Sequence, residues 1–114
     1  MRDFSFQIKK KNNKYFFALY PNNIPYQDIG RSCEFESKEL CIKALSDFRN
    51  FVKEHKISNE NSQYIQIVRK NIFYYFSYVD GNNTLFYRKK GYWSKNSCIK
   101  GICSIWRNID AVLK

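Results

Sequence analysis

The chain has 114 residues, of which 44% are hydrophobic and 18% aromatic, so it has enough apolar surface for a packed core and is too apolar for a disordered chain. Twenty Lys and Arg against ten Asp and Glu give a net charge of +10. This excess predicts attraction to polyanions such as nucleic acid, acidic proteins or anionic lipid surfaces, and it is equally compatible with an inert basic surface.

Nothing in the sequence predicts a membrane segment, a leader or a cofactor site. No apolar run approaches the roughly 18 residues of a membrane helix, and the N-terminus runs directly into an alternating strand pattern instead of a signal peptide. We therefore expect a cytoplasmic protein without membrane contact, in which the four cysteines are thiols. No two of them have CxxC spacing, and His55 is the only histidine, so neither a metal site nor a cofactor is expected.

The first elements along the chain are predicted to be strands. Residues 4–9 alternate between apolar and polar side chains, which is the pattern of a half-buried strand. An Asn-rich turn at residues 11–14 leads into an aromatic strand over residues 15–20. Pro25 cannot donate a ladder hydrogen bond, so the strand that follows is predicted to be an edge strand or irregular.

A helix is predicted next. Ser37 is a suitable N-cap because its hydroxyl can accept a hydrogen bond from a free amide of the first turn. The apolar residues that follow have the i, i+4, i+7, i+11 spacing of one buried helix face. They are Cys41, Leu45, Phe48 and Val52. A polar linker over about residues 55–62 ends the first half of the chain.

The second half, residues 64–114, repeats the first half, residues 4–57, so the chain is an internal duplication. The aromatic strand recurs over residues 74–78, 59 positions later, and a Gly-containing turn precedes a third strand over residues 84–89. The helix recurs 57 positions later, with Ser94 as its predicted N-cap. Its apolar face matches that of the first helix and consists of Cys98, Ile102, Ile105 and Ile109.

This duplication predicts the fold class. A unit of three strands and one helix cannot close a core alone, whereas two such units can share one. We therefore predict an α+β protein with one domain over residues 1–114, in which two tandem β-β-β-α repeats form one antiparallel sheet and both helices pack on one face.

Several motifs resemble those of the YegP-like family of small bacterial proteins, which have no assigned biochemical function. They are the aromatic strand Tyr74–Tyr78, the hairpin Gly81-Asn82, and Tyr92-Trp93-Ser94-Lys95 followed by Gly101-Ile102. The resemblance covers nearly the whole chain, with a closer match in the second half. It implies tandem β3-αβ units joined in one sheet with swapped C-terminal strands, and it supplies no catalytic residues.

Catalysis is not predicted. Cys41 and Cys98 belong to the apolar helix faces, which leaves Cys33 and Cys103 as candidate nucleophiles and His55 as a candidate base. The acidic residues are scattered, and no Gly-rich loop could hold a phosphate. The sequence therefore predicts a non-enzymatic protein, and a cysteine-dependent enzyme remains an open alternative.

A binding surface is predicted on the sheet face opposite the helices. If Phe17, Phe76 and Tyr78 face the helices, strand alternation places another aromatic and basic set on the uncovered face. The predicted surface consists of Lys9, Phe16, Tyr20, Tyr64, Tyr75, Phe86 and Arg88. Such a surface suits a protein-interaction, dimer or structural module, which we favour. The alternative is binding of single-stranded nucleic acid or another polyanion, which replacement of Tyr75 or Arg88 would weaken.

A second predicted site is the start of the second helix. Ser94, Lys95 and Lys90 place a hydroxyl and two cations near free amides, an arrangement suited to an anion. Ordinary helix capping beside a solvated charge cluster is the competing interpretation. Because the halves differ most around the third strand, we expect any specific function to lie in the more basic second half.

Overall fold

Two matching sets of elements follow each other along the chain in the computed structural model, which describes residues 3–114. The first half contains β1 (Phe4–Lys11), β2 (Lys14–Pro21), β3 (Gly30–Arg31) and α1 (Lys38–Glu54). The second half contains β4 (Ile65–Lys70), β5 (Phe73–Asp80), β6 (Asn83–Tyr87) and α2 (Lys95–Arg107).

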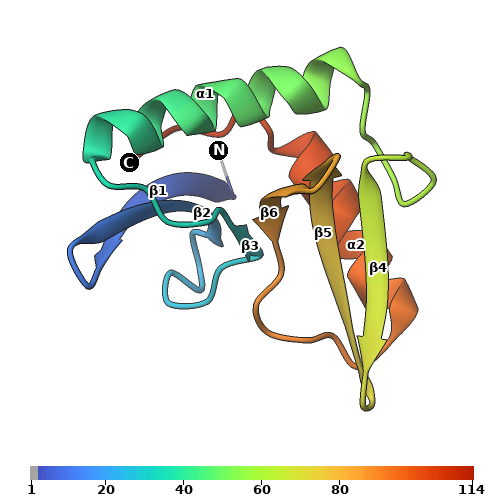
Figure 1. Cartoon of the computed structure of the whole chain (residues 1–114). Coiled ribbons are helices and arrows are strands. Elements are labelled where there is room, and N and C mark those ends of the chain that lie inside the picture. Colours follow the sequence, from blue (N-terminus) through green and yellow to red (C-terminus); the bar gives the residue numbers. More distant parts are fainter. Residues whose placement is uncertain (1–2) are drawn as a thin grey trace.

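All six strands form one antiparallel sheet in the order β1-β2-β3-β6-β5-β4. The halves meet at its centre, where Arg31 of β3 pairs with Tyr87 of β6. The β1–β2 and β4–β5 hairpins project at opposite sides, and α1 and α2 pack on the same face (Figure 1). The predicted fold class is therefore confirmed.

The hairpin turns have the backbone that their sequence predicts. Asn12 and Asn13, between β1 and β2, have φ angles of 52° and 66°. Asn71 and Gly81 have φ angles of 58° and 62° in the two hairpins of the second half. Positive φ matches the turn to the twist of the strands, and Asn and Gly adopt it at low cost.

Both helices begin at the predicted caps. The hydroxyls of Ser37 and Ser94 each accept a hydrogen bond of 3.1 Å, from the amides of Leu40 and Ser97 respectively. The predicted apolar faces are buried and join one cluster that also contains inward-facing strand residues of both halves.

Phe48 of α1 lies at the centre of this core. Its ring centroid is 5.8 Å from that of Phe17 on β2, 5.4 Å from Tyr78 on β5 and 4.7 Å from Phe86 on β6. One helix residue thus contacts strands of both halves, which explains how the duplicated units share a single core.

The third strand of the first half differs from its prediction. Pro25 lies in the loop before it, and β3 is reduced to two residues, so the strand is irregular as predicted. It is nevertheless central and not at an edge, because β6 pairs with it. Gly30 permits this contact, since a Cβ atom there would lie 2.4 Å from Cε2 of Phe86.

The segment after α2 returns to the first half. The amide of Phe6 on β1 donates to the carbonyl of Val112 at 2.8 Å, and the amide of Lys114 donates to the carbonyl of Phe6 at 2.9 Å. Lys53 of α1 forms an ion pair of 2.9 Å with Asp110. The end of the second half thus lies beside the first strand of the first half, although it makes a single bridge and not a full strand.

Candidate functional site

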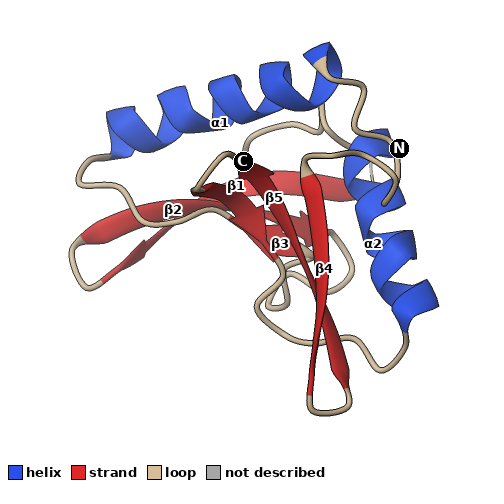
Figure 2. Cartoon of the chain, turned by 45° about the vertical axis from the view of Figure 1, so that its right-hand side comes forward, coloured by secondary structure: helices blue, strands red, loops and turns tan. Residues whose placement is uncertain are grey.

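The sheet face opposite the helices, called here the open face, has no helix over it in the described part of the chain (Figure 2). Strand pairing defines its members, because paired residues project to the same side. In the first half they include Lys9, Phe16, Ala18, Tyr20 and Arg31. In the second half they include Val68, Lys70, Phe73, Tyr75, Ser77 and Tyr87.

Trp93 belongs to the open face as well, and the sequence prediction did not include it. Tyr74 of β5 forms an antiparallel bridge with Tyr92, which places the next residues, Phe73 and Trp93, opposite each other on the other side. The ring centroids of Phe73 and Trp93 are 4.9 Å apart, and Trp93 is 74% exposed.

The first half has an ion pair where the second half has these rings. Lys14 matches Phe73 and Glu36 matches Trp93, and their charged groups lie 3.3 Å apart. This difference between matched positions is the sequence signal that could have identified Trp93. Because the first half folds in the same way with Glu36 at the matched position, the fold does not require the exposed Trp93.

On the open face of the first half, neighbouring cations lie over the aromatic rings. Phe16 and Tyr20 are buried. The guanidinium of Arg31 lies 4.8 Å from the ring centre of Phe16, and Nζ of Lys9 lies 5.1 Å from that of Tyr20. Burial raises the pKa of Tyr20, Asp28 adds to the shift and Arg31 opposes it. These rings are therefore poor candidates for stacking against a ligand.

The open face of the second half is hollowed. A shallow depression of about 280 Å³ lies over β4, β5 and β6. The rings of Tyr75 and Tyr87, the exposed side chain of Val68, and the cations Lys70 and Lys89 are among its lining residues. On this part of the open face, half-buried aromatic rings thus lie beside exposed cations.

The strands are strongly basic. Their single carboxylate is Asp80, at the end of β5. Their seven cations are Lys9, Lys10, Lys11, Lys14, Arg31, Arg69 and Lys70. Three acidic residues lie on α1, but four cations lie on the same helix, so its charges nearly balance.

Phe86 does not lie on the open face, and its prediction is wrong. Tyr78 pairs with Phe86 and Val79 with Thr84, so a β-bulge leaves Leu85 as an extra residue in β6. The bulge exchanges the two faces beyond it. Phe86 is therefore fully buried under α1, while Thr84 and Tyr87 face the other side.

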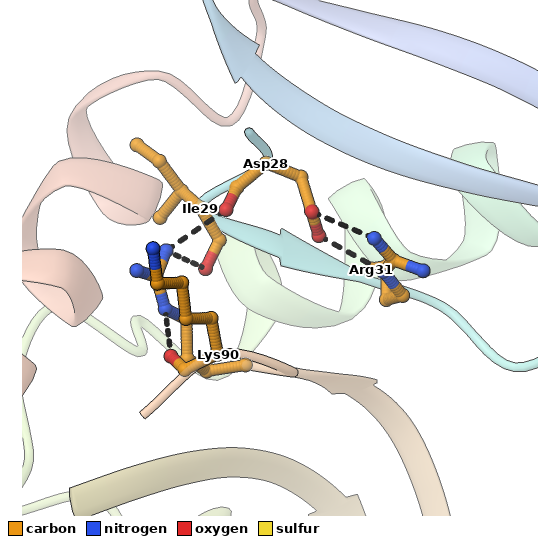
Figure 3. Close-up of polar contacts among 5 residues, drawn as sticks. Asp28, Ile29, Arg31 and Lys90 are labelled. Atoms are coloured by element: carbon orange, nitrogen blue, oxygen red, sulfur yellow. Dashed lines mark hydrogen bonds and ion pairs between the residues drawn. The ribbon is translucent and has the colours of Figure 1, made fainter. Parts of the chain in front are cut away.

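Arg88 is also misplaced by the prediction in that it is a buried structural residue, although it is among the lining residues of the depression. Its guanidinium donates to the carbonyls of Asp28 at 2.8 Å, Ile29 at 3.3 Å, and Lys90 (Figure 3). It also lies 4.2 Å from the ring centre of Tyr92. Arg88 therefore joins the second half to the loop before β3.

Arg31 of β3 binds the same loop. The guanidinium of Arg31 donates to both carboxylate oxygens of Asp28, at 2.8 and 3.1 Å. Two arginines thus converge on Asp28, Arg31 on its side chain and Arg88 on its main chain.

Tyr64 is the third misplaced residue. It precedes β4 and lies outside the strand, and its ring contacts those of Phe51 and His55 at 5.0 and 4.4 Å on the helix side. Of the predicted surface, the structure brings Lys9, Phe16, Tyr20 and Tyr75 to the open face.

The predicted anion site at the start of α2 remains a prediction. Ser94 caps the helix, and its hydroxyl also donates to that of Ser97 at 3.0 Å. Lys90 and Lys95 are exposed, and neither forms an ion pair with any residue from 3 to 114.

The cysteines and the acidic residues do not assemble a reactive or metal-binding group. Within residues 3–114, no three His, Cys, Asp or Glu side chains gather as a metal site, and no hydrogen bond joins His55 to a thiol.

None of the described helices is both long and apolar enough to cross a membrane.

Alkylation should separate the thiols. Burial, with a smaller contribution from Cys33, raises the pKa of Cys41 to about 11, and burial raises that of Cys98 to about 11 against the opposing effect of Arg88. At about pH 8, near the ordinary thiol pKa, we expect iodoacetamide to modify exposed Cys33 while these two cysteines stay intact. Peptide mass spectrometry of the folded protein checks this, and modification of Cys98 as fast as Cys33 would contradict the buried placement.

The sequence matches no protein-family model and no curated protein. Its structure, however, resembles two structures determined by solution NMR. YegP from E. coli, a protein of unknown function, is 20% identical with a TM-score of 0.73, over 100% of this chain and 93% of YegP. A UPF0339 protein from Shewanella oneidensis is 17% identical with a TM-score of 0.76, over 99% of this chain and 91% of that one. This chain has the YegP fold.

The resemblance that the sequence motifs predict is thereby confirmed at the level of the fold. At sequence identities of 17% and 20%, the structural similarity shows a shared fold and does not show a shared function. YegP is itself described as a protein of unknown function. Any function of the YegP fold in this chain must therefore be argued from its own side chains.

Proposed function

We propose that this protein is a non-enzymatic module that binds single-stranded nucleic acid on the open face of its second half. The observation that carries the proposal is the depression between Tyr75 and Tyr87, which has Lys70 and Lys89 beside it and the exposed Trp93 on the same face. Base rings stack on such side chains while phosphates meet the lysines.

The chemistry of this face favours a polyanion over a protein partner as its ligand. A stable protein interface has an apolar centre with few charges. Val68, which is 44% exposed, is the one aliphatic residue that lines the depression, and its neighbours are rings, hydroxyls and cations. The depression therefore offers little aliphatic surface for the apolar centre of a protein interface.

Binding of an oligonucleotide of about twelve nucleotides, as RNA and as DNA, tests the proposal. Because stacking contributes about 1–3 kcal/mol per base, Trp93→Ala and Tyr75→Ala should each weaken binding about tenfold or more. The reporter is tryptophan fluorescence. Stacking on Trp93 should quench the emission of the natural protein, whereas Trp93→Ala, which retains only Trp106, should give little quenching.

A matched pair of lysine variants controls for net charge. Lys70→Gln removes a cation beside the depression, and Lys100→Gln removes an exposed one from α2 on the other side of the sheet. We expect the first change, and not the second, to reduce the slope of log affinity against log salt concentration by about one. Equal effects of the two changes, or no binding in low salt, would refute the proposal.

A protein partner remains the second candidate, on a different observation. β4 is an edge strand of the sheet, and an extended segment of another protein could add to it. Arg69 and Lys70 on this edge oppose indiscriminate pairing, as charged residues at sheet edges generally do. Sedimentation of the purified protein would favour this candidate if it showed a dimer in the absence of nucleic acid.

A further inference from the structure

A second concave site lies on the helix side of the sheet. It is a cleft of about 490 Å³ between α1, the segment before it, and the β5–β6 turn. Figure 1 shows that this turn lies below α1. This volume is within the range of small-molecule sites, about 300–1,000 Å³. Thr84 lines both this cleft and the depression of the open face, and the other lining residues of the two differ.

The interior of the cleft is apolar and largely aromatic. Phe17 and Phe48 are buried beneath it, and Phe35, Phe51 and Leu85 form half-buried walls. Ala44, whose side chain is short, also lines the cleft on the α1 side. A ligand that enters the cleft therefore covers apolar surface that is otherwise in contact with water, which favours an apolar ligand body.

The rim of the cleft is negative, although the chain has a net charge of +10. Asp47 and Asp80 are among its lining residues, and no Lys or Arg lines it. Asp47 pairs with Lys43 at 3.2 Å, but both side chains are mostly exposed, so this pair is weak. Asp80 forms no ion pair within residues 3–114.

The duplication shows that this rim is not a requirement of the repeat. The matched positions of the other half carry Ser104 in place of Asp47, Pro21 in place of Asp80, and Lys90 in place of Cys33. The residues beneath the cleft, in contrast, keep their apolar character, as Phe17 and Phe48 match Phe76 and Ile105. The requirements of folding therefore explain the apolar residues beneath the cleft, but they do not explain the carboxylates of Asp47 and Asp80.

We propose that this cleft binds a small organic cation, with an aromatic or other apolar body and a primary ammonium group. The body covers the aromatic interior, and the ammonium group lies at the rim near Asp47 and Asp80. This site does not rest on the nucleic-acid site, because the two share only Thr84 among their lining residues.

Three probes of one shape test the charge requirement. Phenethylamine is the cation, 2-phenylethanol is its neutral analogue, and phenylacetate carries the opposite charge. Amide chemical shifts in NMR report where each one binds. We expect phenethylamine to bind with a dissociation constant of about 1 mM, as suits a ligand of this size, and to shift amides of α1 and of the β5–β6 turn. The alcohol should bind several-fold more weakly, and the acid should not bind.

Cys33 provides an independent readout, because it is exposed and lines the cleft. Saturating phenethylamine should slow alkylation of Cys33 several-fold and leave Cys103, which lies on α2, unaffected. Equal protection of both thiols, or none of Cys33, would overturn the proposal.

Variants separate the charge from the shape of the cleft. Asp80→Asn should weaken phenethylamine several-fold and leave 2-phenylethanol unchanged, whereas the control Glu60→Gln, an equal charge change outside the cleft, should alter neither. Ala44→Leu should fill the cleft and weaken both ligands. The proposal fails if the alcohol binds as tightly as the amine, if no shifts occur at about 10 mM, or if Asp80→Asn has no effect.

Discussion

Replacement of Arg88 with methionine is expected to lower the free energy of unfolding by about 3 kcal/mol. Three carbonyl oxygens, those of Asp28, Ile29 and Lys90, lose a charged donor together, and two of them belong to the other half of the chain. Methionine retains the apolar stem against Tyr92, so the loss reports mainly on the hydrogen bonds. Urea denaturation of both proteins measures the difference.

Lys89→Met is the matched control, since it removes the same charge from the neighbouring exposed position. We expect it to change the free energy of unfolding by less than about 0.5 kcal/mol. Similar stabilities of the two variants would mean that Arg88 does not hold the halves together. The comparison also matters for ligand binding, because Arg88 lines the depression and weak binding by an Arg88 variant would combine partial unfolding with a lost contact.

Replacement of Phe48 with alanine is expected to cost about 3–5 kcal/mol, as is usual when a buried Phe is truncated to Ala. The ring contacts Phe17, Tyr78 and Phe86, which come from three strands and both halves, so the cavity cannot be closed by a shift of one element. Because domains of this kind have only about 5–15 kcal/mol of stability, the variant should unfold well below the natural protein on heating.

Ile42→Ala serves as the control for this change. It removes a mostly exposed aliphatic residue from the same helix and should cost under about 1 kcal/mol. A loss below about 1.5 kcal/mol for Phe48→Ala would contradict its central position, because the truncation of an aromatic residue in a packed core generally costs at least twice as much.

The sequence was sufficient to predict those features of the fold that depend on neighbouring residues. Ser37 and Ser94 cap helices, the Asn-rich turn has positive φ angles, and the apolar helix faces are buried. Each of these follows from spacing within a few residues, and the duplication provides a second, independent instance of every such pattern.

The errors arose where a residue's position depends on distant parts of the chain. Strand alternation failed for Phe86 because the bulge at Leu85 is set by pairing with β5, and the sequence of β6 gives no sign of it. Arginine is usually found at the surface, but Arg88 is buried by the loop that contains Asp28, 60 positions earlier in the chain. The central place of β3 likewise depends on β6.

The candidate site was therefore only partly predictable. Tyr75 was placed correctly because it lies in a regular hairpin, and Trp93 was missed because its position depends on the bridge between Tyr74 and Tyr92. The depression and the acidic cleft are products of tertiary packing between elements. That a specific function lies in the second half remains a prediction.

The excess of cations in the strands, seven against one carboxylate, also has a kinetic consequence. The positive field around the strands attracts a polyanion before any atoms touch. Encounters with the strand side should consequently be more frequent than random collision allows at low ionic strength, and this advantage should decline as salt is added. The rings, which act only at contact, then determine how long an encounter lasts.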